Sequence, residues 1–233
     1  IKQAIPHVLG FRITNSVELK SLLTNWGVPL DQILLLYSLY LDFDVFRPIS
    51  VPIEYDAIFV GRLTDNKAPH LFLDSVAKAA DQKKDIRVLI VGQGPLVSGL
   101  HQRTIKLGLS QNVEFKDWVS NSTELANYYR RSRCLVCTSY SEGGPRVVAE
   151  ALACGTPIIT TRVGLANELI KDGVNGFFID WSVDMLENRL MQIISDTNLR
   201  DRMASEAPRS VQRYEKDRVM SEYVSCYKQL ISQ

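Results

Sequence analysis

The chain has 233 residues, 45% of them hydrophobic and 23% charged, which is enough for one sizeable domain or for one domain and part of another. Its formal net charge of +1 excludes a strong overall attraction to nucleic acid or to an anionic membrane surface. Four cysteines in a chain of this length do not indicate a disulfide framework, and the longest apolar run, at residues 33–41, is too short to span a bilayer.

The first 48 residues are the least regular part of the sequence. Their pattern predicts a strand over residues 8–14 and a helix over residues 16–26 that ends at Gly27. The apolar run at residues 33–41 comes next, and D-F-D-V-F-R-P at residues 42–48 is typical of a linker.

From residue 57 onward the chain alternates between short apolar runs and helical patterns. The predicted strands cover residues 57–60, 87–91, 113–115, 134–138, 157–161 and 176–179. The intervening helices cover residues 69–80, 95–107, 123–131, 166–170, 183–195, 199–205 and 217–230. This alternation predicts an α/β fold with a Rossmann-like, doubly wound parallel sheet covered on both faces. Ligands bind to such sheets at the C-terminal ends of the strands.

One further helix follows the fourth predicted strand, in the stretch S-Y-S-E-G-G-P-R-V-V-A-E-A-L-A-C-G-T-P. Gly143 and Gly144 predict a tight turn, Pro145 suits the first helical position, and Gly155 is well placed to end the helix. A helix start offers unpaired N–H groups and a partial positive charge, and glycines let the backbone approach an anion closely. The stretch is therefore suited to holding a phosphate.

Two carboxylates accompany this turn, Glu142 on the turn and Glu150 within the helix, with seven residues between them. Carboxylates accept hydrogen bonds from the hydroxyls of sugars and riboses, so the pattern suits a nucleotide sugar. In the alternative interpretation Glu142 only favours the helix start, and Glu150 pairs with Arg146 one turn earlier. Arg146 in a first turn opposes the helix dipole, which is easier to accept if an anion binds there.

Two cations lie on the loop after the first strand of the sheet, in G-R-L-T-D-N-K. Arg62 and Lys67 there could stabilise the charge of a diphosphate, or they could be a solvated surface pair. The next loop, V-G-Q-G-P-L, contains Gly92 and Gly94, but a lone G-x-G is a weak signal.

E-G-G-P-R-V-V-A-E-A-L-A-C-G-T-P resembles the E-x7-E signature of family 4 retaining glycosyltransferases, which have the B-type (GT-B) fold. The loops G-R-L-x-x-x-K, G-x-G-P and V-G-L-A-N-E-L-I also resemble family loops. Within these motifs three positions depart from the family pattern: Gly144 stands where an aromatic residue is usual, and Ala68 and Leu165 stand where glycines are usual.

The resemblance implies that this chain is the C-terminal, donor-binding half of a GT-B enzyme, with most of the N-terminal, acceptor-binding domain absent. The segments expected are the end of the N-terminal domain with the linker (1–50), the nucleotide-sugar-binding domain (51–215), and a C-terminal helix that can cross back to the N-terminal domain (216–233). Because the sequence begins with Ile1 and shows no signal peptide, we also expect a fragment of a cytoplasmic protein.

The resemblance also implies roles for individual residues. The catalytic residues are expected to be Glu142, Arg62 and Lys67. The residues expected to bind the donor are Gly61, Gly92, Gly94, Val119, Gly143, Gly144, Arg146 and Glu150. In this hypothesis the base lies near the backbone of Val119, where Trp118 stacks on it or packs against the domain interior. The ribose lies on Glu150, the diphosphate on the cations and the helix start, and the sugar on Glu142.

The expected partners are a nucleotide-sugar donor and a glycan, lipid or other acceptor held by the missing domain, without nucleic acid. We expect no cofactor and no metal, because the two cations and the helix dipole can neutralise the leaving diphosphate. Asp42-Phe43-Asp44 resembles a D-x-D metal motif but precedes the sheet, so a linker pair is the default. A sugar-nucleotide epimerase of the same fold and a non-catalytic partner subunit remain alternatives.

The other chemically suggestive residues favour structural roles. Cys134 and Cys137 form a C-x-x-C within an apolar strand, and we expect buried thiols there. The three histidines share no motif. Arg130, Arg131 and Arg133 cluster at a predicted helix end, where the dipole favours cations, and they leave open a peripheral contact with the inner face of a membrane.

Overall fold

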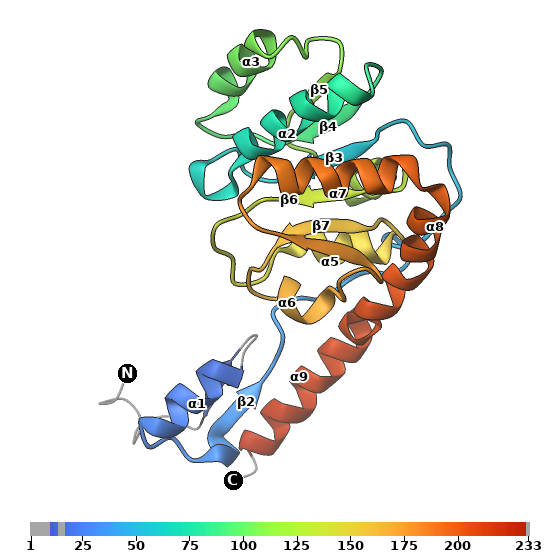
Figure 1. The fold of residues 1–233 in the computed structure, drawn as a ribbon. Helices are drawn as coiled ribbons and strands as arrows, with labels where there is room; N and C mark the ends of the chain where they lie inside the picture. The colour runs from blue at the N-terminus through green and yellow to red at the C-terminus, as the bar shows by residue number, and fades with distance from the viewer. Residues whose placement is uncertain (1–9, 14–16, 232–233) are drawn as a thin grey trace. The chain divides into compact units, whose positions relative to one another are not determined.

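The computed structural model describes residues 10–13 and 17–231 of the chain (Figure 1). The chain divides into a large unit, Phe43–Gln212, and a small unit formed by Ile1–Asp42 together with Arg213–Gln233. The large unit begins earlier than the expected segment 51–215 because the linker packs against it. Phe46 is buried, and the buried Arg130 donates hydrogen bonds to linker carbonyls.

The large unit contains a six-stranded parallel sheet in the order β5-β4-β3-β6-β7-β8. Its strands are β3 (Ala57–Val60), β4 (Val88–Val91), β5 (Val113–Lys116), β6 (Leu135–Cys137), β7 (Ile158–Thr161) and β8 (Gly176–Ile179). All residues of β3, β4, β6, β7 and β8 are buried, as expected for short apolar runs in a sheet covered on both faces. The predicted α/β fold with a doubly wound parallel sheet is confirmed.

The strand order reverses between β3 and β6, which are neighbours in the sheet although two strands separate them in the sequence. In an open parallel sheet such a reversal leaves a crevice at the C-terminal ends of the two strands, because their connections leave in opposite directions. The loops after β3 and β6 carry the residues that the sequence singled out.

Helices cover both faces of this sheet. They are α2 (Pro69–Gln82), α3 (Val97–Lys106), α4 (Ser122–Arg130), α5 (Arg146–Ala153), α6 (Ala166–Leu169), α7 (Val183–Ser195) and α8 (Thr197–Glu206), with 3-10 helices η3 (Asp65–Lys67) and η4 (Ala207–Tyr214). On one face α5 contacts β6, β7 and α4. These bounds agree with the predicted helices to within a few residues at each end.

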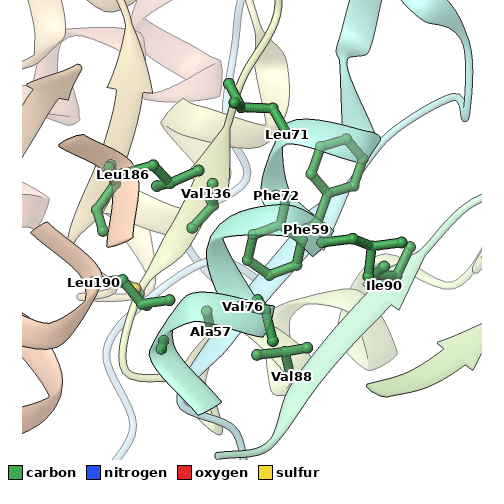
Figure 2. Close-up of a cluster of buried hydrophobic side chains, with 14 of the residues drawn as sticks. Ala57, Phe59, Leu71, Phe72, Val76, Val88, Ile90, Val136, Leu186 and Leu190 are labelled. Atoms are coloured by element: carbon green, nitrogen blue, oxygen red, sulfur yellow. The ribbon is translucent and has the colours of Figure 1, made fainter. Parts of the chain in front are cut away.

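Figure 2 shows the core between the other face of the sheet and helices α2 and α7. Alternate residues of β3 and β4 point into it, as the two-residue period of a strand requires. Phe59 of β3 and Phe72 of α2 are almost fully buried, and their rings stack with centroids 5.9 Å apart. Truncating a buried phenylalanine of this kind to alanine typically costs about 3–5 kcal/mol. This core therefore fixes β3, and with it the loop that carries Arg62 and Lys67.

The small unit combines both ends of the chain. Its elements are β1 (Phe11–Ile13), α1 (Val17–Asn25), η2 (Leu30–Gln32), β2 (Ile33–Leu35) and α9 (Lys216–Ile231). β1 and β2 pair in parallel, and Leu23, Val28 and Ile33 form a small core. Tyr223 of α9 donates a hydrogen bond to the carbonyl of Tyr37, so the C-terminal helix packs with the N-terminal segment. Residues 8, 9, 14 and 16 of the predicted strand and helix lie outside the described residues.

Two helix starts differ in detail from the sequence prediction. Pro145 has φ −68° and ψ 96°, so it is the N-cap and α5 begins one residue later, at Arg146. Ala68, which stands where the family pattern has glycine, adopts a left-handed conformation with φ 45° and ψ 47°. The chain therefore enters α2 through a backbone geometry that glycine adopts without strain, at a cost of about 1–2 kcal/mol for alanine.

Candidate functional site

A cavity of about 490 Å³ opens at the C-terminal edge of the sheet, beside the point where the strand order reverses. It is bounded by the loops after β3, β4, β5 and β6 and by the start of α5. Its lining residues are Gly61, Arg62, Lys67, Gln93, Trp118, Glu142, Gly144, Pro145, Arg146 and Val147. The structure thus brings the three predicted catalytic residues into one cleft, with three cations and one carboxylate on its walls.

Lys67 and Glu142 form an ion pair across this cleft, between Nζ and Oε1. The hydroxyl of Ser139 also donates a hydrogen bond to Glu142 Oε1, at 2.8 Å. Within the described part of the chain Oε2 of Glu142 accepts no hydrogen bond. One oxygen of the carboxylate is therefore held by the protein, and the other can accept a hydrogen bond from a ligand.

Arg62 differs from the other two cations of the cleft. Its side chain is exposed, and it makes no ion pair or hydrogen bond with any residue that the structure describes. Arg146, by contrast, donates from Nε to Glu150 at 2.8 Å. A cation without a protein partner on a cleft wall is suited to binding an anion, because no existing ion pair has to be broken.

Gly92 and Gly94 bring the loops after β3 and β4 into backbone contact. A Cβ atom on Gly92 would lie 1.9 Å from the carbonyl oxygen of Gly61, and one on Gly94 would lie 2.3 Å from that of Leu63. The N–H of Leu63 donates to the carbonyl of Gln93 at 2.8 Å. The space at these two glycines is therefore filled by protein backbone, and Gln93 between them reaches the cleft wall.

The loop after β7 supports the turn that carries Glu142. Gly164 has φ 42°, and a Cβ atom there would lie 2.3 Å from the carbonyl oxygen of Glu142 and 2.4 Å from that of Gly143. The N–H of the next residue, Leu165, donates to the carbonyl of Gly143 at 3.3 Å. Leu165 is buried, and a Cβ atom on Gly144 would lie 3.7 Å from its Cβ. A side chain at position 144, where the family pattern has an aromatic residue, would thus meet Leu165, which stands where that pattern has glycine.

Glu150 is not among the residues that line the cleft, and it is 6% exposed. It accepts hydrogen bonds from Arg146 Nε at 2.8 Å and from the Tyr129 hydroxyl at 3.1 Å. Burial raises the pKa of Glu150, while the hydrogen bonds and the charge of Arg146 oppose that rise. The ion pair between Arg146 and Glu150, one helical turn apart, is the one expected if Glu150 has only a structural role. Arg146 itself also lines the cleft.

The loop after β5 contributes Trp118, whose side chain is 60% exposed and lines the cleft. The ring therefore lies at the cleft wall, where it can stack on a base, and is not packed in the domain interior. The neighbouring Val119 is half-buried and is not part of the lining.

The remaining polar candidates have structural partners. Arg130 is buried against linker carbonyls, Arg131 pairs with Glu54, and Arg133 pairs with Asp56, so the basic cluster is not a free cationic surface. No helix within the described ranges is long and apolar enough to cross a membrane.

The predicted burial of the cysteine pair is confirmed. Cys134 and Cys137 are both buried and unpaired, and burial raises the pKa of both thiols. Among residues 10–13 and 17–231 no cluster of three histidine, cysteine, aspartate or glutamate side chains could hold a metal ion.

Gly164→Ala should displace the turn that carries Glu142, because the new methyl group would overlap two carbonyl oxygens. We expect the free energy of unfolding to fall by about 2–4 kcal/mol, from left-handed strain and overpacking together. The matched control is Gly173→Ala, where φ is 76° but no atom lies within 4 Å of the added carbon. Urea unfolding measures both, and equal losses in the two variants would contradict the proposed clash.

Glu150 should make stability depend on pH. Its pKa is raised in the folded state, so between 4.5 and that raised value the native protein binds more protons than the unfolded chain. Its contribution to the free energy of unfolding therefore falls as pH rises through this window. Compared with wild type, Glu150→Gln should become relatively more stable with rising pH, as measured by urea unfolding. If the free energy of unfolding of Glu150→Gln, measured relative to wild type, stays constant or falls as pH rises, the raised pKa of Glu150 is refuted.

Several known proteins are similar to this chain. It is 32% identical over 194 residues to a protein of Corynebacterium urealyticum named D-inositol 3-phosphate glycosyltransferase, covering 79% of this chain and 45% of that one. A protein of the same name from Streptomyces bingchenggensis is 32% identical over 181 residues, with 39% of its length covered. The chain thus spans less than half the length of these curated relatives.

Solved structures show the same fold. The C-terminal domain of a glycosyl transferase group 1 family protein from Francisella tularensis has a TM-score of 0.68 and 25% identity, covering 76% of this chain and 99% of that one. HepE of Anabaena, solved with UDP and glucose, has a TM-score of 0.79 and 23% identity, covering 99% of this chain and 65% of that one. The family model described as glycosyl transferases group 1 matches residues 47–210, and the chain therefore belongs to this family.

Proposed function

We propose that this chain is the donor-binding half of a retaining glycosyltransferase that transfers a sugar from a nucleoside-diphosphate sugar to an acceptor. One observation carries the proposal: Arg62, whose side chain has no partner among the described residues, shares one cleft with the Lys67–Glu142 ion pair at the reversal point of a parallel sheet. The relatives named as glycosyltransferases support the same reaction class.

The cations of the cleft suit the diphosphate of such a donor. In the proposal Arg62 and Lys67 bind its oxygens, helped by the N–H groups at the start of α5. Pro145 has no N–H, so Gly144 and Arg146 are the donors there. The Gly144 N–H makes no hydrogen bond with the described residues, which is consistent with a ligand-binding role.

The rings of the donor lie on either side of this diphosphate in our proposal. The sugar hydroxyls reach Oε2 of Glu142, and the base lies by Val119, with the exposed ring of Trp118 as a stacking surface. The ribose lies towards Glu150, which requires the half-exposed Arg146 side chain to turn aside and free one oxygen of that carboxylate.

In the transfer step the bond between the anomeric carbon and the diphosphate oxygen breaks, and the diphosphate leaves with the bonding electron pair. Preorganised cations stabilise this developing charge, so we propose that no metal is required. The acceptor hydroxyl forms the new bond to the anomeric carbon with retention of configuration, and its proton passes to the leaving diphosphate. The groups that bind a glycan, lipid or other acceptor belong, in this proposal, to the rest of a longer protein.

Removing either cation should weaken nucleotide binding. Arg62→Ala and Lys67→Ala should each lose about 1.5–3 kcal/mol of binding free energy towards a nucleoside diphosphate, the size of a hydrogen bond to a charged group. The measurement is calorimetry with UDP, GDP and ADP, after thermal-shift screening of wild type selects the diphosphate that binds. Arg202→Ala, at an exposed arginine of α8 outside the cleft, is the control. Unchanged affinity in both cleft variants would refute the diphosphate site.

Glu142→Gln should separate transfer from nucleotide binding. In the full-length protein sugar transfer should fall by about 100-fold or more, because a charge at the reacting centre is lost. Diphosphate affinity should stay the same or rise, since Lys67 is freed from its ion pair. The control is Glu124→Gln, at an exposed residue of α4 outside the cleft.

Product analysis of the same reactions tests the alternatives. Free nucleotide and epimerised sugar formed without an acceptor would indicate an epimerase, and an absence of any nucleotide binding would indicate a non-catalytic subunit. Transfer in excess EDTA should match transfer without it, and loss of activity that added metal restores would overturn the metal-free proposal.

A further inference from the structure

The hydroxyl of Ser139 is placed to control the carboxylate of Glu142. Ser139 follows the end of β6 and is 1% exposed. Its hydroxyl donates to Glu142 Oε1 at 2.8 Å, and its backbone carbonyl accepts a hydrogen bond from the Thr161 hydroxyl at 2.6 Å. The donor to Glu142 is therefore anchored to β7, next to β6 in the sheet.

Lys67 is the second donor to the same oxygen, but it is held differently. Its backbone is fixed, because Thr138 donates from its hydroxyl to the Lys67 carbonyl at 2.8 Å. Its side chain is a flexible stem with a compact charge, it is 21% exposed, and it lines the cleft. An ammonium group in this position is strongly attracted to a doubly charged diphosphate, so it can exchange Glu142 for the ligand.

Ser139 cannot make such an exchange. Its side chain has a single heavy-atom torsion and is buried, so it does not extend to a ligand in the cleft. Within the described part of the chain, the other polar neighbour of its hydroxyl is the Cys137 sulfur at 3.7 Å, a weak partner. The 2.8 Å contact with the carboxylate is the stronger of the two.

We propose that Ser139 is a positioning residue: its hydroxyl keeps Oε1 of Glu142 in place after Lys67 has turned to the bound diphosphate, so that Oε2 stays available to a hydroxyl of the donor sugar. Lys67 then acts twice, first as the partner of Glu142 in the empty cleft and then as a ligand of the diphosphate. Ser139 alone of the two holds the carboxylate in both states. The inference rests on the proposed function and adds a residue to the sugar-binding part of the same site.

The test compares two affinities in the same variant. Calorimetry on the 233-residue chain gives Kd for a diphosphate and for its sugar conjugate, with UDP and UDP-glucose, GDP and GDP-mannose, and ADP and ADP-glucose as probes. In Ser139→Ala we expect the diphosphate Kd to stay within about twofold of wild type. The Kd of the sugar conjugate should rise by about three- to tenfold, the range of one net hydrogen bond. Ser139→Thr, which keeps a hydroxyl, should restore most of that loss.

Ser75→Ala is the matched control, since Ser75 is a fully buried serine of α2 whose hydroxyl donates to the Leu71 carbonyl at 2.8 Å. It should lower stability without changing the ratio of the two dissociation constants. A ratio in Ser139→Ala equal to that of wild type, or a parallel loss of both affinities, would overturn the role of Ser139. Failure of wild type to bind any of the three diphosphates would instead overturn the proposed function itself.

Discussion

At two places on the C-terminal edge of the sheet, the backbone of one loop packs directly against the backbone of the next. Gly92 lies against the carbonyl of Gly61, and Gly164 lies against the carbonyl of Glu142, at distances that leave no room for a Cβ atom. Backbone atoms cannot move aside by changing rotamer. The loop after β3 is therefore fixed against the loop after β4, and the loop after β6 is fixed against the loop after β7. The position of Arg62 and of the Glu142 turn depends on this packing, because both lie on loops whose backbones are fixed from the neighbouring strand.

On this rigid frame the three cations of the cleft are in three different states. The Arg62 side chain has no partner among the described residues, Lys67 is paired with Glu142 on the cleft wall, and Arg146 is paired with the buried Glu150. An incoming anion can therefore bind one cation without breaking an ion pair, whereas a second cation must first leave a carboxylate. In our proposal the exchange at Lys67 would couple the diphosphate position to the sugar position, because the carboxylate that Lys67 leaves is the one proposed to face the sugar.

Much of this arrangement follows from the sequence, because buried parallel strands place the residues after them at one edge. That rule was enough to predict that Arg62 and Glu142 share a cleft. It could not predict the role of Ser139, since the partner of a buried hydroxyl depends on a single torsion and on neighbours from other strands. Gly164 was equally hidden, because a glycine that supports a turn far away in the sequence has the same local pattern as any turn glycine. The sequence does not decide the position of the Trp118 ring, because an aromatic residue after a strand suits the interior and a cleft wall equally well.

The departures from the family pattern show what that pattern encodes. Ala68 replaces a glycine and yet keeps the left-handed backbone that leads into α2, where its carbonyl and that of Lys67 accept hydrogen bonds from Thr138. Gly144 lacks the usual side chain, and Leu165, which has one where glycine is usual, lies next to the vacated position. In both places a residue that departs from the family pattern lies in a backbone arrangement that its neighbours support: Thr138 donates a hydrogen bond to the carbonyl of Ala68, and Leu165 packs beside Gly144.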